Sequence, residues 1–185
     1  MTVPRRLALL SALALAGCVS TSDEPFSLDD GDAAPAAAGR YLCASYDAAG
    51  DRVAETHEGR LIPLRRNKQT QYVFVDDKTT SESPFTLHRA KGSLFIVAVA
   101  HSDAPGEDFY VAEFRNGDKE FALYSEGDDL EARAQGAARE HAVTFARNQF
   151  SSDLSGPVDG QKAFMVEMAS DLTGWKISAD CRAKP

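Results

Sequence analysis

The stretch Leu94–Ala100, with the sequence LFIVAVA, is apolar at every position. A strand buried on one face alternates apolar and polar residues, whereas a strand covered on both faces is apolar throughout. The stretch therefore predicts a central strand. It also predicts that a second layer of structure packs on the face that a single sheet would leave in water.

Downstream of this stretch, the pair Asn116-Gly117 favours a type I′ turn and hence a β-hairpin. A two-residue turn places Phe114 opposite Lys119. Alternation along the two strands then gathers five apolar side chains on one face, which we expect to meet the core: Tyr110, Ala112, Phe114, Phe121 and Leu123.

Upstream of the stretch, Ala90-Lys91-Gly92 predicts a turn that follows a strand at Phe85–Arg89. Period-two alternation predicts three earlier strands, at Tyr41–Tyr46, Arg60–Arg65 and Gln71–Val75. Turns between consecutive strands indicate an antiparallel meander.

After the hairpin, the period of the pattern changes. Apolar residues recur at helical spacing from Asp128 to Asn148, although the β-branched pair Val143-Thr144 leaves open that 140–147 is another strand. A second helix is predicted at Gln161–Leu172, and a final strand at Trp175–Cys181.

Strands followed by helices and a closing strand indicate a single α+β domain over residues 40–185, in which two helices cover one face of an antiparallel meander. This order of elements also resembles that of the lipocalins. That family's first strand carries Gly-x-Trp, where this chain has Gly39-Arg40-Tyr41. The resemblance implies an alternative fold, a lipocalin-like β-barrel.

The N-terminus has the features of a secretory signal. Arg5 and Arg6 precede the apolar run Leu7–Ala16, which only Ser11 interrupts. A helix needs about 20 apolar residues to cross a bilayer, so this run predicts a removable signal peptide over residues 1–17.

The signal ends in Leu15-Ala16-Gly17-Cys18, which resembles the lipobox of bacterial lipoproteins at all four positions. The resemblance implies that the Cys18 thiol receives a diacylglyceryl group, that cleavage occurs before Cys18, and that the new amine is often acylated. Several acyl chains hold a protein firmly to a membrane. Val19 stands where an aspartate retains such proteins at the inner membrane, so the expected location is the outer membrane, facing the periplasm, if the source is Gram-negative.

Residues 18–39 are predicted to be the lipidated cysteine and a flexible acidic tether, because the segment is rich in small and acidic residues and has no basic residue before Arg40. Phe26 and Leu28 fit either a docking motif or two stray apolar residues, the commoner case. Removing Arg5 and Arg6 leaves 18 basic against 28 acidic residues, a net charge of −10. We therefore expect the domain to hang from its tether and not to lie on anionic headgroups.

With Cys18 assigned to lipid, Cys43 and Cys181 remain, one near each end of the domain. Disulfides persist in exported proteins, so we expect a bond between them, which requires the first and last strands to lie close together. Two free thiols and a metal pair are the alternatives. No histidines stand at ligand spacing to support a metal pair.

The strongest local cluster of polar residues is the loop around Pro105-Gly106, at the end of the predicted central strand. Its side chains offer oxygen and nitrogen ligands that suit a divalent cation, but any solvated turn has a similar composition. No metal and no cofactor are therefore assigned. The candidate residues are His101, Asp103, Glu107 and Asp108.

Three functions are compatible with the sequence. The first is a non-catalytic lipoprotein whose domain contacts another envelope protein, and the second is a carrier of a small apolar ligand or lipid. The third is an envelope hydrolase with dispersed catalytic residues, for which no nucleophile or metal motif is found. The net charge of −8 and the absence of a basic cluster exclude nucleic acid as an expected partner.

Overall fold

The computed structural model describes residues 18–26, 38–47, 49–66, 69–78, 82–101, 105–117, 119–148 and 151–185. The predicted signal peptide, Leu28 and Asp103 lie outside these residues. The elements in chain order are β1 (Val19–Thr21), β2 (Gly39–Tyr46), β3 (Arg52–Arg66), β4 (Gln69–Asp76), β5 (Glu82–Lys91), β6 (Leu94–Ala100), β7 (Glu107–Arg115), β8 (Glu120–Glu126), α2 (Leu130–Glu140), β9 (Thr144–Arg147), β10 (Ser152–Ser155), α3 (Val158–Ala169) and β11 (Trp175–Ala183).

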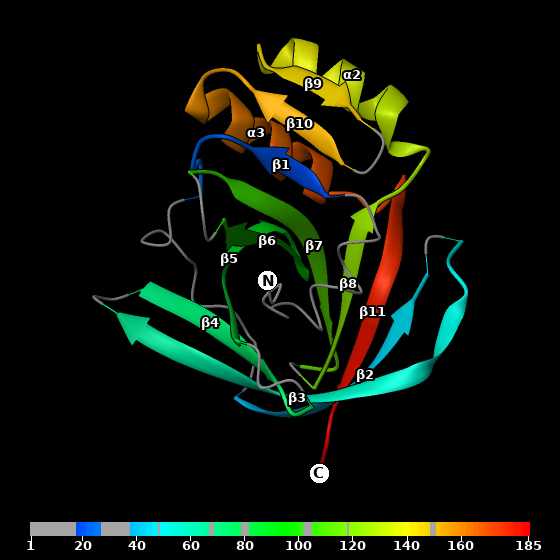
Figure 1. Cartoon of the computed structure of the whole chain (residues 1–185). Coiled ribbons are helices and arrows are strands. Elements are labelled where there is room, and N and C mark those ends of the chain that lie inside the picture. Colours follow the sequence, from blue (N-terminus) through cyan, green and yellow to red (C-terminus); the bar gives the residue numbers. More distant parts are fainter. Residues whose placement is uncertain are drawn as a thin grey trace, which may run out of the picture.

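Within the described residues, eight antiparallel strands form a closed barrel in the order β6-β5-β4-β3-β2-β11-β8-β7, and β6 pairs with β7 to complete the ring (Figure 1). Three further strands and two short helices complete the part of the fold that the structure describes. The predicted α+β class is therefore wrong, because the molecule is mostly β and its main sheet closes on itself. Alternation identified the strands, but no local pattern encodes the pairing of β11 with both β8 and β2.

The β7–β8 hairpin has the predicted faces and a different register. Arg115 is opposite Glu120 and Phe114 is opposite Phe121, so the predicted pairing of Phe114 with Lys119 is wrong. Asn116 and Gly117 have the positive φ angles of a type I′ turn, 49° and 58°, but the loop is two residues longer than such a turn. A shift of two residues keeps every side chain on its face.

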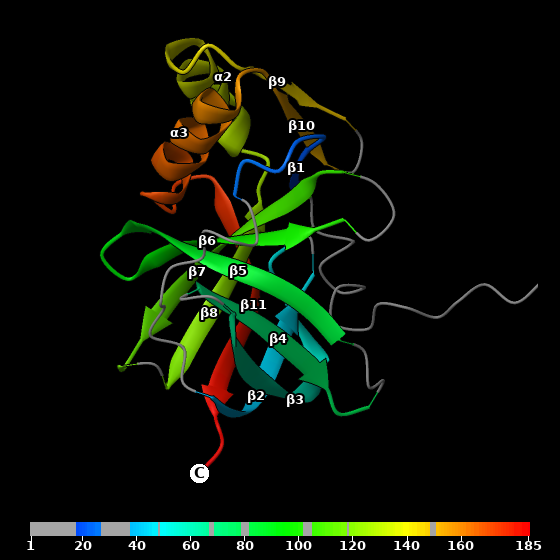
Figure 2. The same cartoon turned by 90° about the vertical axis from the view of Figure 1, so that its left-hand side faces the viewer.

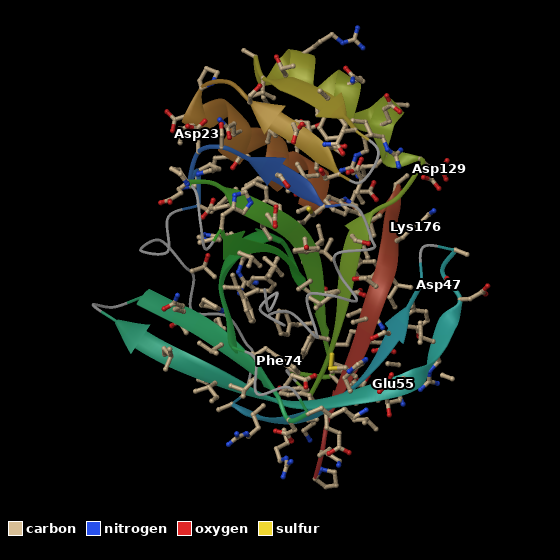
Figure 3. All side chains as sticks on the ribbon, viewed as in Figure 1. Asp23, Asp47, Glu55, Phe74, Asp129 and Lys176 are labelled. Carbon is tan, nitrogen blue, oxygen red and sulfur yellow. A yellow bond between two sulfur atoms is a disulfide. The ribbon has the colours of Figure 1, made fainter. Side chains whose placement is uncertain are left out.

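The side chains inside the barrel form what we call the interior cluster. Four of the five apolar hairpin residues belong to it, and the fifth, Leu123, packs against it, as expected. The Phe74 ring, labelled in Figure 3, lies over Gly59 so closely that a Cβ there would stand 2.3 Å from it. The predicted disulfide is confirmed, since Cys43 and Cys181 are directly opposite each other in β2 and β11 and are bonded. The interior cluster comprises Tyr41, Cys43, Leu61, Tyr72, Phe74, Leu87, Phe95, Val97, Tyr110, Ala112, Phe114, Phe121 and Cys181.

A second layer packs on the outside of the barrel at β6 and β7 (Figure 2). It consists of both helices and a small extension in which β1 pairs with β7, β10 with β1, and β9 with β10. Strand β6 is covered on both faces as predicted, with Phe95 inside the barrel and Ile96 outside. The side chains of this outer cluster are Val19, Phe26, Ile96, Ala98, Phe109, Val111, Leu130, Ala134, Ala137, Ala138, Phe145, Leu154, Phe164, Met165, Met168, Ala169 and Trp175.

The first predicted helix is shorter than expected and is followed by the strand that the sequence left open. Helix α2 ends at Glu140, Ala142 adopts a left-handed conformation with φ of 54°, and β9 begins at Thr144. The β-branched pair Val143-Thr144 therefore marks the change from helix to strand. The second helix begins three residues before the predicted Gln161.

The predicted flexible tether is wrong for its first residues. Val19–Thr21 form strand β1, and Phe26 is 1% exposed. Composition alone suggested disorder, but the β-branched side chains of Val19 and Thr21 are buried in the fold. The folded unit thus includes residues 18–26. No helix in the described part of the chain is long and apolar enough to span a membrane.

Candidate functional site

Strand β1 lies at a fork in the barrel wall. On the same edge of β7, β8 pairs with residues 111–115, whereas β1 pairs with Asp108 and Phe109. Successive β1 side chains point to opposite faces, so Val19 joins the outer cluster while Cys18 packs against the interior cluster. We call the end of the barrel at this fork the Cys18 end.

One carboxylate oxygen gathers the polar side chains at the Cys18 end. The Ser20 hydroxyl donates to Asp108 Oδ1 at 2.6 Å, and His101 Nε2 lies 3.0 Å from the same atom. The Cys18 thiol also donates to it, at 3.6 Å. The contact between Ser20 and Asp108 joins residues 88 positions apart, which explains why the loop sequence alone did not reveal Ser20.

The predicted loop cluster is divided between two faces of β7. His101 and Asp108 come together, but Glu107 points to the outer side, and Asp103 lies outside the described residues. Gly106 holds the turn with φ of 128°, where a Cβ would lie 2.1 Å from the Thr21 carbonyl oxygen. Among the residues that the structure describes, no group of three or more side chains is arranged to hold a metal ion.

Glu107 is a buried carboxyl that holds the N-terminal segment. Its Oε2 accepts the backbone N–H of Phe26 at 2.9 Å. Burial raises the pKa of Glu107 to about 7, and the negative charge of Glu24 adds to the rise. The Phe26 hydrogen bond is the main opposing effect, and the positive charge of Lys162 also favours the ionised form.

The Phe26 ring occupies an aromatic site on the outer side of the barrel. It lies 4.7 Å from the His88 ring and 5.5 Å from the Phe109 ring, with Lys162 Nζ 5.5 Å from its centroid. Phe26 is therefore a docking residue, the option that the sequence ranked second. Its only sequence signal is that it is a large aromatic side chain in a polar segment.

A second buried carboxyl, Glu126, lies at the end of β8 near the fork. It accepts the Ser152 hydroxyl at 2.6 Å, and the Ser152 backbone N–H donates to the Cys18 carbonyl at 2.9 Å. Burial raises the pKa of Glu126 above its usual value. Both carboxyls with a raised pKa thus bond groups that hold the N-terminal segment or its neighbour β10.

The chemistry of the Cys18 end does not favour catalysis by the thiol. Burial raises the pKa of Cys18 to about 11, and the negative charge of Asp108 adds to the effect. The unmodified thiol is therefore protonated at neutral pH and is a poor nucleophile. Burial also raises the pKa of Tyr110, its hydrogen-bond partner, well above the usual range.

Comparisons with known proteins match this chain to no family model, no curated protein and no solved structure. Its function is therefore argued from its own residues.

Proposed function

We propose that this protein is an envelope lipoprotein, held to the membrane through lipid on Cys18, whose barrel carries a small apolar ligand or lipid at the Cys18 end. The observation behind this proposal is that the Cys18 side chain packs against the interior cluster of a closed barrel. Eight-stranded barrels enclose an interior that side chains fill or that holds one small ligand.

A row of inward-facing apolar side chains near Cys18 suits such a ligand. Val99 of β6 is opposite Asp108 of β7, and the β5–β6 register places Phe85 beside Val99. Both side chains pack against the interior cluster yet keep part of their surface accessible. Tyr72, which is directly opposite Phe85 and stacks on its ring, and Phe95 are by contrast at most 1% exposed. An apolar ligand would therefore contact the barrel at the row containing Phe85 and Val99.

The lipid anchor is tested first. The mature wild-type protein should partition into detergent, with an intact mass that starts at Cys18 and includes its acyl chains, whereas Cys18→Ala should remain uncut and without lipid. A mature chain that begins elsewhere, or an unmodified Cys18, would contradict the anchor.

The ligand is tested by photocrosslinking in membranes with a diazirine fatty acid that carries an alkyne tag. Crosslinked peptides should include β5 and β6. Val99→Glu should reduce their yield several-fold because it puts a charge on the apolar row. Val99→Met keeps the site apolar and should preserve the yield, as should Ile62→Glu on the outer face of β3. Equal labelling of all four proteins, or labelling only of outward-facing residues, would contradict the carrier function.

Contact with another envelope protein is a second candidate. Ile62 and Leu64 lie on the same outer face of β3 and are 37% and 38% exposed. Exposed neighbouring apolar side chains suit a protein contact. A photoreactive amino acid at position 62 should capture a discrete partner in intact cells, while one at exposed Asp159 on α3 should not. The same capture pattern at both positions would count against a specific contact through β3.

A further inference from the structure

The residue that carries the proposed lipid is part of the folded domain. Its carbonyl oxygen accepts the Ser152 N–H at 2.9 Å, and the next residue, Val19, is paired on both sides, with Phe109 of β7 and Ser152 of β10. No free residue separates Cys18 from strand β1.

Contacts that follow β1 keep this segment in place. Gln161 of α3 donates to Asp23 Oδ2 at 2.8 Å, and Figure 3 shows Asp23 between β1 and α3. Phe26 is held by its hydrogen bond to Glu107 and by its buried ring. The segment 18–26 is therefore fixed at its start, its middle and its end.

From this geometry we infer that the Cys18 end of the barrel lies directly against the lipid bilayer. The inference rests on the proposed lipidation of Cys18. A flexible tether over residues 19–39 would let the domain move about 25 Å from its anchor. With β1 docked, the lipid instead leaves the protein at the barrel wall, beside the row of apolar side chains that the proposed ligand would contact.

The covalent lipid, and not charge, holds this surface at the membrane. Carboxylates at this end include Asp108, Glu24 and the buried Glu107, and the cationic groups that face them are Lys162 and, when protonated, His101. Such a surface gains little from anionic headgroups. The contact should therefore persist at high salt, unlike binding by a basic patch.

The experiment places one fluorophore at each end of the barrel. In the lipidated protein, Cys18 is blocked and Cys43 is bonded to Cys181, so an introduced cysteine is the only reactive thiol. Pro105→Cys labels the exposed turn beside β1. Lys119→Cys labels the loop beyond the other end of β7, whose residues 108–115 span about 24 Å. Both proteins are reconstituted into phosphatidylcholine vesicles that contain a headgroup-linked quencher.

The label at position 105 should be quenched several-fold more than the label at position 119. A Gly-Ser spacer of about ten residues between Cys18 and Val19, which spans roughly 17 Å, should abolish the difference while vesicle binding persists. Equal quenching of the two labels in vesicle-bound protein, or a difference that survives the spacer, would overturn the inference. Failure of the protein to float with vesicles would instead overturn the proposed lipid anchor, and the inference with it.

Discussion

The interior cluster and the outer cluster are held together in different ways. The interior cluster is enclosed by a ring of paired strands, which the Cys43–Cys181 disulfide joins at the contact between β2 and β11. No disulfide joins the described residues of the outer cluster, and this cluster takes Val19 and Phe26 from the segment that follows Cys18. The proposed lipid anchor is thus coupled to the outer cluster by packing, while the barrel is closed by its own strands.

Breaking the disulfide should have the largest effect of the changes considered. The bond closes a loop with a sequence separation of 138, for which the chain-entropy model gives about 5 kcal/mol. The double variant Cys43→Ala/Cys181→Ala should lose most of this amount in its free energy of unfolding, as measured by urea denaturation. A loss below about 1 kcal/mol would contradict this expectation. It would mean that residual structure already restricts the unfolded chain when the disulfide is absent.

Phe26→Ala should weaken the outer cluster and leave the interior cluster closed. Removing a buried phenylalanine side chain costs about 3–4 kcal/mol. Here this cost destabilises the docked state of residues 18–26. Hydrogen exchange should speed up in β1 and β10 and remain slow in β3 and β4. Ile62→Ala, at an exposed site on β3, is the control and should not change the exchange rates of either pair of strands. Uniformly faster exchange would show that the two clusters unfold as one unit.

Glu107→Gln should give the smallest change, and one that depends on pH. Because the folded pKa of about 7 exceeds the usual 4.5, the native state binds the proton more tightly than the unfolded chain. Wild-type stability from this group is therefore complete below about pH 4.5 and falls as the pH rises toward 7, by up to about 3 kcal/mol. Glutamine keeps an acceptor for the Phe26 N–H and does not titrate.

The gain in stability of Glu107→Gln over the wild type should therefore grow between pH 4.5 and pH 7 and then level off. Urea unfolding of both proteins at several pH values measures this difference. The contribution of Glu126 cancels because both proteins contain it. A difference that stays constant with pH would contradict a raised pKa at Glu107.

The sequence predicted strands, faces and the disulfide better than it predicted architecture. The apolar run Leu94–Ala100 correctly predicted a strand covered on both faces. The number and positions of the cysteines correctly predicted the disulfide between Cys43 and Cys181. That pairing also required the first and last strands of the predicted domain to meet, and the contact between β2 and β11 is what closes the barrel. The alternation of apolar and polar residues along a strand is the same in an open meander and in a closed barrel, so it does not predict whether the sheet closes.

The candidate site was only partly visible in the sequence. His101 and Asp108 lie in one loop region and were identified together, although Glu107, their neighbour, faces the other side of β7. Ser20 was missed because a strand of three residues is too short to display a period. Phe26 was named as part of a docking motif, but the interpretation as a stray apolar residue was preferred because it stands in a polar segment. Their roles depend on tertiary contacts with β7 and with the aromatic site around His88.

The position of β11 between β8 and β2 has a consequence for folding. Strand β8 ends at Glu126 and β11 begins at Trp175, 49 positions later. Until β11 is in place, β2 and β8 each present an unpaired backbone edge, and such edges invite pairing with other chains. Distant pairings form slowly, so the chain is most prone to aggregate in the interval before β11 docks. Oxidation of Cys43 and Cys181 then makes the closed barrel difficult to reopen.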